Sequence, residues 1–293
     1  MPVIYSNVNV DERYFKGFAP TLYTNSWMLP GISCNDEYQR DGAAGGYYVR
    51  KLNISDNNGP TAPGSNFNHK NSGASLVQIV LNNGYAESEN IAEAVAENVE
   101  APIATARLEA NVQVVRQRSE RSGISCLYTE GTRGTTGEVT AENVKDVLLD
   151  ERQAVSESNG EANVILASPH VYTALLKSAG KEFFQNTNEK IITTGRVGDW
   201  FGFKVFEVNA FANPLAVPYI YNNYAGEEKT LAAADVKKIN FVMYDWRTFA
   251  KLTNLRMYRL KDSEDFNGVR AQTEVVCGYR VIEKGLVRVH TTA

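Results

Sequence analysis

Residues 88 to 122 constrain this fold more than any other stretch, because they contain no glycine and only one proline. Ser88 or Asn90 can cap a helix, and apolar residues then recur every four positions. Pro102 would kink a helix interior, and Gly123 suits the position after a helix end. The pattern therefore predicts a short helix, a break near Pro102 and a second helix that ends at Gly123. A helix of about 20 residues spans ~30 Å and needs other parts of the chain packed along it.

The composition is that of a globular protein and excludes several functional classes. Hydrophobic residues make up 43% and charged residues 22% of the 293 residues, and the net charge is −4. No apolar run is long enough to span a membrane, the first residues do not resemble a secretory signal, and there is no global basic field for nucleic acid. Cys34, Cys126 and Cys277 are far apart and form no CxxC pair, which favours buried free thiols over a zinc site.

The first 87 residues predict two segments that extend from a core. Hydrophobic residues in 1–46 follow neither a helical nor a strand period, so we expect an arm that lies on another surface. Residues 47–54 and 74–81 read as two strands. The sequence between them is rich in Gly, Pro, Asn and Ser, which predicts a protruding hairpin with a long tip.

The middle of the chain predicts an α/β unit. A short strand is expected at residues 124–128, followed by the breaker sequence GTRGTTG. Two residues separate its successive glycines, whereas a phosphate-binding loop has four between its glycines, so we interpret the segment as a domain boundary. Thr140 is expected to cap a helix, and residues 163–167 to form a buried strand. Ser168 is expected to cap a second helix.

The rest of the chain predicts a strand pair, a loop-rich stretch and a group of C-terminal strands. Gly198 and Gly202 suit bulges or tight turns within the pair, and the chain to about residue 233 is loop-rich. The C-terminal strands form a long antiparallel hairpin that can lie along the long helix. They are expected at 239–243, 255–260, 269–276, 279–283 and 285–290.

No catalytic, cofactor-binding or metal-binding constellation is predicted. The three histidines are scattered, and neither HExxH nor a Ser/His/Asp arrangement is present. Asp262, Glu264 and Asp265 could bind a cation, but they lack EF-hand spacing and its glycine, which favours a solvated turn. The alternative that the chain is an α/β enzyme would need a catalytic site, and the sequence supplies none. The alternative of a secreted adhesin is disfavoured because no secretory signal is found.

Three stretches together resemble a known family. Residues 168–176, SPHVYTALL, follow a buried strand, and residues 195–209 read GRVGDWFGFKVFEVN. A long strand pair with an acidic turn then closes on GLVRV. In this order the chain resembles the major capsid protein of tailed bacteriophages, which has the α+β Hong Kong 97 coat fold. The motif residues are Gly195, Gly198, Gly202, Phe203 and Asn209.

The resemblance implies a division of the chain. Residues 1–46 would be an N-terminal arm and residues 47–87 an extended hairpin loop lying on the adjacent subunit. Residues 88–131 and 241–293 would form the peripheral domain, with the long helix as its spine and the C-terminal residues supplying its long sheet. Residues 132–240 would form the axial domain.

The resemblance also implies a function. The chain would self-assemble into rings of five and six that build an icosahedral shell around the phage genome, in the virion, after assembly in the host cytoplasm. Expected partners are other copies of the chain, scaffolding and portal proteins, and double-stranded DNA enclosed without sequence-specific binding; no membrane partner, cofactor or enzyme activity is expected. The alternative is an encapsulin-type compartment. Arg116, Arg118 and Arg121 are expected to form a solvated or interfacial helix face rather than a DNA contact.

Some members of this family cross-link their subunits through a Lys–Asn isopeptide bond. By this resemblance Lys51 or Lys70, on the hairpin loop, and Asn267, in the acidic turn, could serve as partners. Such a bond would need a buried carboxylate to accept the lysine proton.

Overall fold

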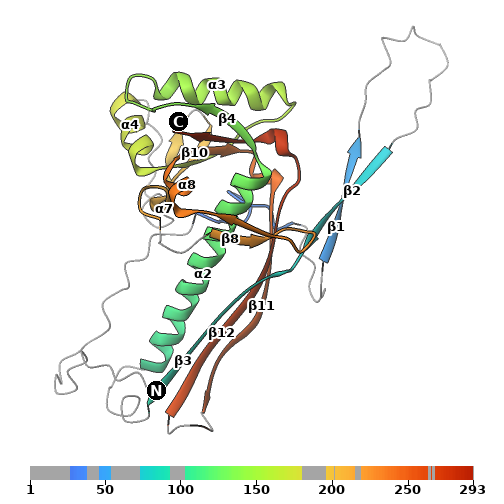
Figure 1. The fold of residues 1–293 in the computed structure, drawn as a ribbon, viewed down its shortest axis with the longest axis vertical. Coiled ribbons are helices and arrows are strands. Elements are labelled where there is room, and N and C mark those ends of the chain that lie inside the picture. The colour runs from blue at the N-terminus through green and yellow to red at the C-terminus, as the bar shows by residue number, and fades with distance from the viewer. Residues whose placement is uncertain are drawn as a thin grey trace.

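The computed structural model describes residues 27–37, 46–53, 73–92, 103–179, 196–200, 202–214, 219–262, 265 and 268–292. Two parts stand out in Figure 1: a globular part around a six-stranded sheet, and an elongated part in which one long helix lies along a three-stranded sheet. A hairpin, β1 (Gly46–Asn53) with β2 (Gly73–Val80), projects to one side.

The long helix α2 (Ile103–Glu130) begins where Pro102 predicts and runs into the globular part. The predicted end at Gly123 is wrong, and so is the predicted strand at 124–128, because the helix continues for seven residues beyond Gly123. Gly123 faces the side chains of Trp27, Met28 and Phe249, and a side chain there would collide with the methyl group of Met28. The glycine therefore allows close packing instead of ending the helix.

The predicted short helix from Ser88 is also wrong, because residues up to Ala92 belong to the strand β3 (Asn83–Ala92). Two carboxylates on the helix-facing side of β3 pair with α2: Glu87 with Arg118 at 2.7 Å and Glu89 with Arg107 at 3.7 Å. Residues 93–102 lie outside the described part.

The three-stranded sheet has the order β11 (Phe249–Asp262), β12 (Gly268–Val281), β3, with antiparallel neighbours. This confirms the long C-terminal hairpin and its position along the helix. On the helix-facing side of β12, Ala271 and Thr273 are buried. Tyr279 and Ser119 join the sheet to α2, their hydroxyl oxygens 2.7 Å apart.

The six-stranded sheet has the order β4–β13–β10–β5–β7–β6. β13 pairs parallel with β4, β5 pairs parallel with β7, and the other pairs are antiparallel. The strands are β4 (Thr132–Thr136), β5 (Val164–Ala167), β6 (Arg196–Trp200), β7 (Phe203–Glu207), β10 (Ile239–Tyr244) and β13 (Val287–Thr291).

Two apolar layers cover this sheet, which explains why every residue of β5 and β10 is buried. The helices α3 (Val144–Glu157) and α4 (Pro169–Ala179) pack on one face. The C-terminal end of α2 packs on the other face, together with α7 (Asn209–Ala212) and α8 (Ala233–Lys237).

The expectation that residues 241–293 as a whole supply the long sheet of the peripheral domain is only partly right, because these residues are divided between two sheets. Only β11, β12 and β3 form that sheet, whereas β10 and β13 lie beside β4 and β5. Two short 3-10 helices, η1 (Trp246–Thr248) and η2 (Lys284–Leu286), stand where the chain passes between the two sheets.

Of the two predicted helix caps, the one at the start of α4 is confirmed and the one at the start of α3 is wrong. Ser168 caps α4 as expected, since its hydroxyl accepts a hydrogen bond from the Val171 N–H at 3.3 Å. Thr140 does not cap α3, which begins at Val144 after the turn residue Asn143. The Asn143 side chain instead accepts a bond from the Thr140 N–H at 2.7 Å, so the turn residues satisfy one another before the helix starts.

The segment from Trp27 to Glu37, here called the strap, packs on the chain's own core. Trp27, Met28 and Cys34 are buried, and Asn35 bridges to Ala250 of β11. The interpretation of residues 1–46 as an arm without a place in the core is therefore wrong for the strap. Residues 1–26 and 38–45 lie outside the described part. The three cysteines are buried and free, as predicted.

Candidate functional site

An apolar surface remains uncovered on the elongated part of the molecule. Three large side chains of β11, here called the ledge, are exposed: Leu255 by 60%, Tyr258 by 50% and Leu260 by 39%. In the strand register they stand opposite Val275, Thr273 and Ala271 of β12, on the side of the sheet that packs against α2. β11 is an edge strand, and among the described residues only Asn35, near the start of the strand, bridges to its outer backbone edge.

The β1–β2 hairpin carries a second exposed apolar pair. Its inner face is anchored, since Val49 and Ile79 pack with Ala250 and Leu252 at the base of β11. On its outer face Tyr48 and Leu76 are 64% and 62% exposed. Apolar groups gathered on a projecting hairpin and an edge strand are typical of protein–protein contacts rather than of a small-molecule site.

The β8–β9 hairpin is held against β3 by an exchange of asparagine hydrogen bonds. β8 (Tyr219–Asn222) pairs with β9 (Glu228–Leu231), although the sequence indicated a loop here. Asn83 accepts a bond from the Asn222 N–H at 2.7 Å and donates to the Asn222 carbonyl at 3.1 Å. Asn82 donates to the carbonyl of the following residue, Asn223, at 2.5 Å. These amides couple the two parts of the molecule across about 140 residues of chain.

A buried carboxylate joins the end of α2 to both β12 and β8. The two oxygens of Glu130 accept bonds from Arg280 at 3.1 Å, from the Val281 N–H at 3.0 Å and from the Tyr221 hydroxyl at 3.1 Å. The Arg280 guanidinium also stacks on Tyr224, 3.9 Å from the ring centre. The arrangement fixes the position of α2 against the three-stranded sheet and the β8–β9 hairpin.

The GTRGTTG segment, interpreted from the sequence as a domain boundary, also has a structural role of its own. Most of it forms β4, and a side chain at Gly134 would lie 2.5 Å from a carboxylate oxygen of Glu151. That buried carboxylate accepts bonds from the Thr135 N–H at 2.6 Å, the Thr135 hydroxyl at 2.8 Å and Arg288 at 2.8 Å. The glycine therefore makes room for an internal carboxylate, not for a phosphate.

We expect Gly134→Ala to destabilise the folded chain by about 1–3 kcal/mol, because it forces the Glu151 carboxylate away from its donors. Gly137→Ala is the matched control: nothing lies within 4 Å of a side chain there, and the expected change is within about 0.5 kcal/mol. Urea unfolding followed by circular dichroism measures both. Equal loss in the two variants would contradict the role assigned to Gly134.

The folded chain is expected to lose stability as the pH falls, and two buried groups contribute to this loss. Burial lowers the pKa of His290 below its usual 6.5, although Glu151 opposes the shift. Asn240 lies 3.1 Å from Nδ1 and donates to the Gly137 carbonyl through the same nitrogen, so Nδ1 is an acceptor and His290 is neutral. Hydrogen bonds from Arg288 and Thr135 lower the pKa of Glu151 despite the opposing effect of burial.

The unfolded chain takes up the His290 proton first, so stability falls once the pH drops below about 6.5 and falls again below about 4.5. The slope from one such group is at most about 1.4 kcal/mol per pH unit. Urea midpoints of the unassembled chain between pH 7.5 and 5 measure the first loss, and His290→Gln is expected to flatten it. An unchanged slope in that variant would show that His290 is not its source.

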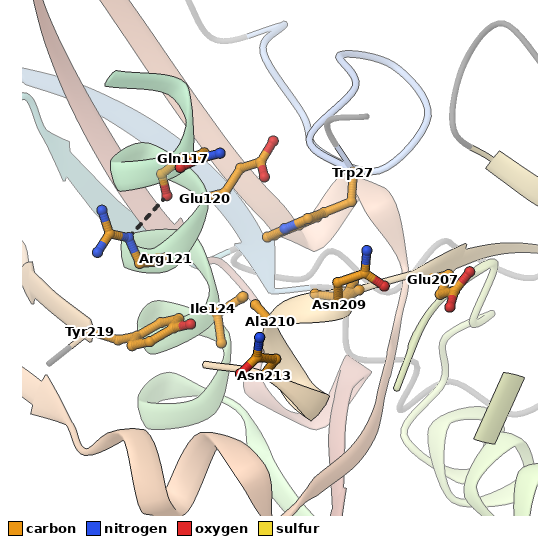
Figure 2. A pocket seen from close by; sticks show the side chains of 11 residues that line it. Trp27, Gln117, Glu120, Arg121, Ile124, Glu207, Asn209, Ala210, Asn213 and Tyr219 are labelled. Carbon is orange, nitrogen blue, oxygen red and sulfur yellow. Dashed lines mark hydrogen bonds between the residues drawn. The ribbon is translucent and has the colours of Figure 1, made fainter. Parts of the chain in front are cut away.

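The sequence-predicted motif residues occupy the β6–β7 hairpin and its continuation. Gly198 lies beside a register shift in β6, and Gly202 has φ +85°, so both match the predicted bulge and turn. Phe203 is buried among α3, α4 and β5. Asn209 begins α7 and lines a pocket beside α2 (Figure 2). Gly195 lies outside the described residues.

The cross-link candidates are not brought together by what the structure describes. Lys51 belongs to β1, and its side chain is outside the described part, as are Lys70 and Asn267. The cross-link stays a prediction. Of the three helix arginines, Arg116 is exposed, Arg118 pairs with Glu87, and Arg121 lines the pocket of Figure 2.

Within the described residues, no group of three or more His, Cys, Asp or Glu side chains could hold a metal ion. No helix among them is long and apolar enough to cross a membrane.

No protein-family model and no curated protein matches the sequence. Solved structures do match over nearly the whole chain. A chain in the capsid structure of the cyanophage P-SCSP1u has a TM-score of 0.64 at 11% identity, covering 95% of this chain and 92% of that chain. The chain has a phage capsid fold. A chain of Mycobacterium phage Che8 has a TM-score of 0.61 at 14% identity, with 94% and 98% covered.

A chain in the capsid of Myoviridae phage XM1 has a TM-score of 0.53 at 12% identity, with 96% and 98% covered. The similarity therefore extends over both parts of the molecule, and the α+β capsid fold expected from residues 168–176 and 195–209 is confirmed.

Sequence reasoning missed the ledge. Apolar side chains that alternate along a strand look the same in the sequence whether their face of the sheet is buried or exposed. It also missed the asparagine exchange, for which the only signal is the pair of Asn-Asn dipeptides.

Proposed function

We propose that this chain is the major capsid protein of a tailed bacteriophage, which self-assembles into rings of five and six that close into an icosahedral shell around the phage genome. The observation that supports this best is the similarity, over more than nine-tenths of both chains, to chains from two phage capsid structures. The phage origin of these structures favours a viral shell over an encapsulin-type compartment.

The exposed apolar surfaces support the same proposal. The ledge and the outer face of the β1–β2 hairpin leave Leu255, Leu76 and Tyr48 more than half exposed. A chain that works alone gains nothing from such side chains, whereas a neighbour can bury them, and permanent interfaces are large and apolar. Head-to-tail contacts between different patches of identical copies generate rings when the rotation closes.

We propose a division close to the expected one, in the Hong Kong 97 arrangement. The peripheral domain comprises β3, α2, β11 and β12, and the axial domain comprises the six-stranded sheet with its helices, including β10 and β13 from the C-terminal residues. The hairpin β1–β2 forms the base of the extended loop of residues 47–87. The predicted N-terminal arm of residues 1–46 includes the strap, which packs on the core.

The proposal assigns the chain a structural role in the virion and no enzyme activity. Its partners are other copies of itself, scaffolding and portal proteins, and enclosed double-stranded DNA. Assembly takes place in the host cytoplasm.

Size-exclusion chromatography and negative-stain electron microscopy of the purified full chain test the proposal. Closed shells, or rings of five and six, are expected. Nucleic acid inside shells from infected cells would support the virus, and a co-purifying enzyme would favour the compartment. A monomer that stays monomeric at high concentration would overturn the proposal.

A further inference from the structure

The outer edge of β11 offers backbone groups to another strand over most of its length. Asn35 of the strap bridges to this edge only at Ala250, near the start of the strand. From Leu252 to Asp262, the described part of the chain places no strand beside the edge. An edge strand that also carries exposed apolar side chains is a template for pairing with another chain. The symmetry of the ledge indicates which chain that is.

The ledge is symmetric about Tyr258. Leu260 lies two residues after the tyrosine, and Leu255 lies three residues before it. The register of β11 against β12 shifts between Leu255 and Met257, which makes Arg256 an extra residue on β11. Counted by their partners on β12, the two leucines are therefore equally far from the tyrosine, one on each side.

This symmetry makes the ledge complementary to itself in an antiparallel pairing. When a twofold axis passes between two copies at Tyr258, the two tyrosines stand opposite each other. Each Leu255 then stands opposite the Leu260 of the second copy, and apolar pairs in this position stabilise a sheet. The same patch is used on both copies, as a twofold contact requires.

The pairing also keeps the layers of the two copies aligned. α2 packs mainly over β12 and β3, and in Figure 1 β11 lies on the side of the sheet away from the helix. A twofold axis perpendicular to the sheet places both α2 helices on the same face of the joined sheet, with the two ledges between them. A closed shell needs this arrangement, because every copy must present the same face to the interior.

The opposite face of β11 carries charges that limit the strength of the contact. Arg259 and Lys261 are exposed there, and Arg259 donates to Gln272 of β12 at 3.0 Å. In the twofold pairing, each Arg259 stands opposite Met257 and diagonal to the other Arg259, about 7–8 Å away. These like charges repel and salt screens them, so the contact is expected to strengthen as the salt concentration rises.

We propose that the ledge and the outer edge of β11 pair with the same surface of a second copy across a twofold axis, which joins two three-stranded sheets into one. The inference rests on the proposed function, which supplies the second copy, and deepens it. Head-to-tail contacts form each ring, and this twofold contact joins one ring to the next.

Cysteine substitutions in the full-length chain test the pairing and its register. Copies with Tyr258→Cys are expected to form a disulfide with one another, because residues directly opposite in an antiparallel pair have Cα atoms about 4.5–5.5 Å apart, which a disulfide can span. Copies with Leu255→Cys are expected to link to copies with Leu260→Cys in mixed assemblies. They are not expected to link to one another, because two Leu255 positions would lie about 14 Å apart. Non-reducing gels after mild oxidation measure the linked dimers.

The parent chain and Leu149→Cys are the controls, since the three native cysteines are buried and Leu149 is exposed on α3, away from the ledge. Tyr258→Cys is expected to give at least about tenfold more linked dimer than either control, because the bond forms only where the geometry fits. Linking of Leu255→Cys to itself, or equal linking in every variant, would overturn the proposal. So would linking of Tyr258→Cys to copies with Leu76→Cys, which would indicate a head-to-tail contact with the β1–β2 hairpin.

The outcome separates this inference from the proposed function. Shells that form without the expected links would overturn the twofold contact and leave the capsid role intact. Linked dimers with the expected register from a chain that forms no shells would uphold the contact and overturn the capsid role. If Tyr258→Cys does not assemble, the mixed Leu255→Cys and Leu260→Cys experiment decides the same question, since it leaves the central tyrosine in place.

Discussion

Replacing Leu255 and Leu260 by glutamate is expected to abolish shell formation while leaving the subunit folded. Both leucines belong to the ledge and are exposed in the single chain, so two charges there cost the fold little, within about 1 kcal/mol. In an assembled shell the same charges would be buried without partners, which costs far more. Sedimentation at a concentration where the parent chain assembles measures the loss.

The control is Leu149→Glu, which places a charge at an exposed leucine of α3, far from the ledge. This variant is expected to assemble. Shells formed by the ledge variant would show that the ledge is not an interface. Failure of both variants with intact folds would mean that assembly responds to added charge rather than to its position.

Glu130→Ala is expected to cause the largest loss of stability of any single substitution considered, about 3–5 kcal/mol, because it removes one partner of a buried ion pair. The change leaves Arg280, the Val281 N–H and the Tyr221 hydroxyl without their shared acceptor. Since Glu130 joins the end of α2 to β12 and β8, the loss should extend to both parts of the molecule.

Urea unfolding of the unassembled chain measures the effect. Glu109→Ala, an exposed glutamate on the same helix, is the matched control, with an expected change within about 0.5 kcal/mol. If the two variants lost equal stability, the Glu130 junction would not be the anchor of α2.

The parts of the fold with a local signal could be predicted from the sequence. Residues 164–167 form a continuous apolar run, and the structure places them at the centre of a sheet covered on both faces. The Ser168–Pro169 start of α4 and the turn at Gly202 follow from the chemistry of those residues alone. The capsid fold followed from the order of such elements.

The wrong predictions are those that depend on distant partners. The polar alternation of β3 resembles a solvated helix until Arg107 and Arg118 supply the partners for its carboxylates. Gly123 resembles a helix end until the strap packs against it. The β8 strand depends on amides of Asn82 and Asn83, about 140 residues earlier.

Less of the candidate site than of the fold could be predicted from the sequence, because its surfaces also depend on residues that are far apart in the chain. Gly198, Gly202 and Phe203 fit their expected turn and core positions, but an exposed leucine such as Leu255 and a buried one look the same in a strand pattern. The pocket is formed by Trp27, Arg121 and Asn209, each nearly 90 or more residues from the next in the chain, so no local spacing indicates it.

The most direct test of the central claim is a cryo-electron microscopy reconstruction of the assembly formed by the purified full chain. The account predicts a closed icosahedral shell of five- and six-membered rings, with the ledge and the outer face of the β1–β2 hairpin buried between subunits. A solution that contains only monomers, or an assembly in which both surfaces still face solvent, would contradict it.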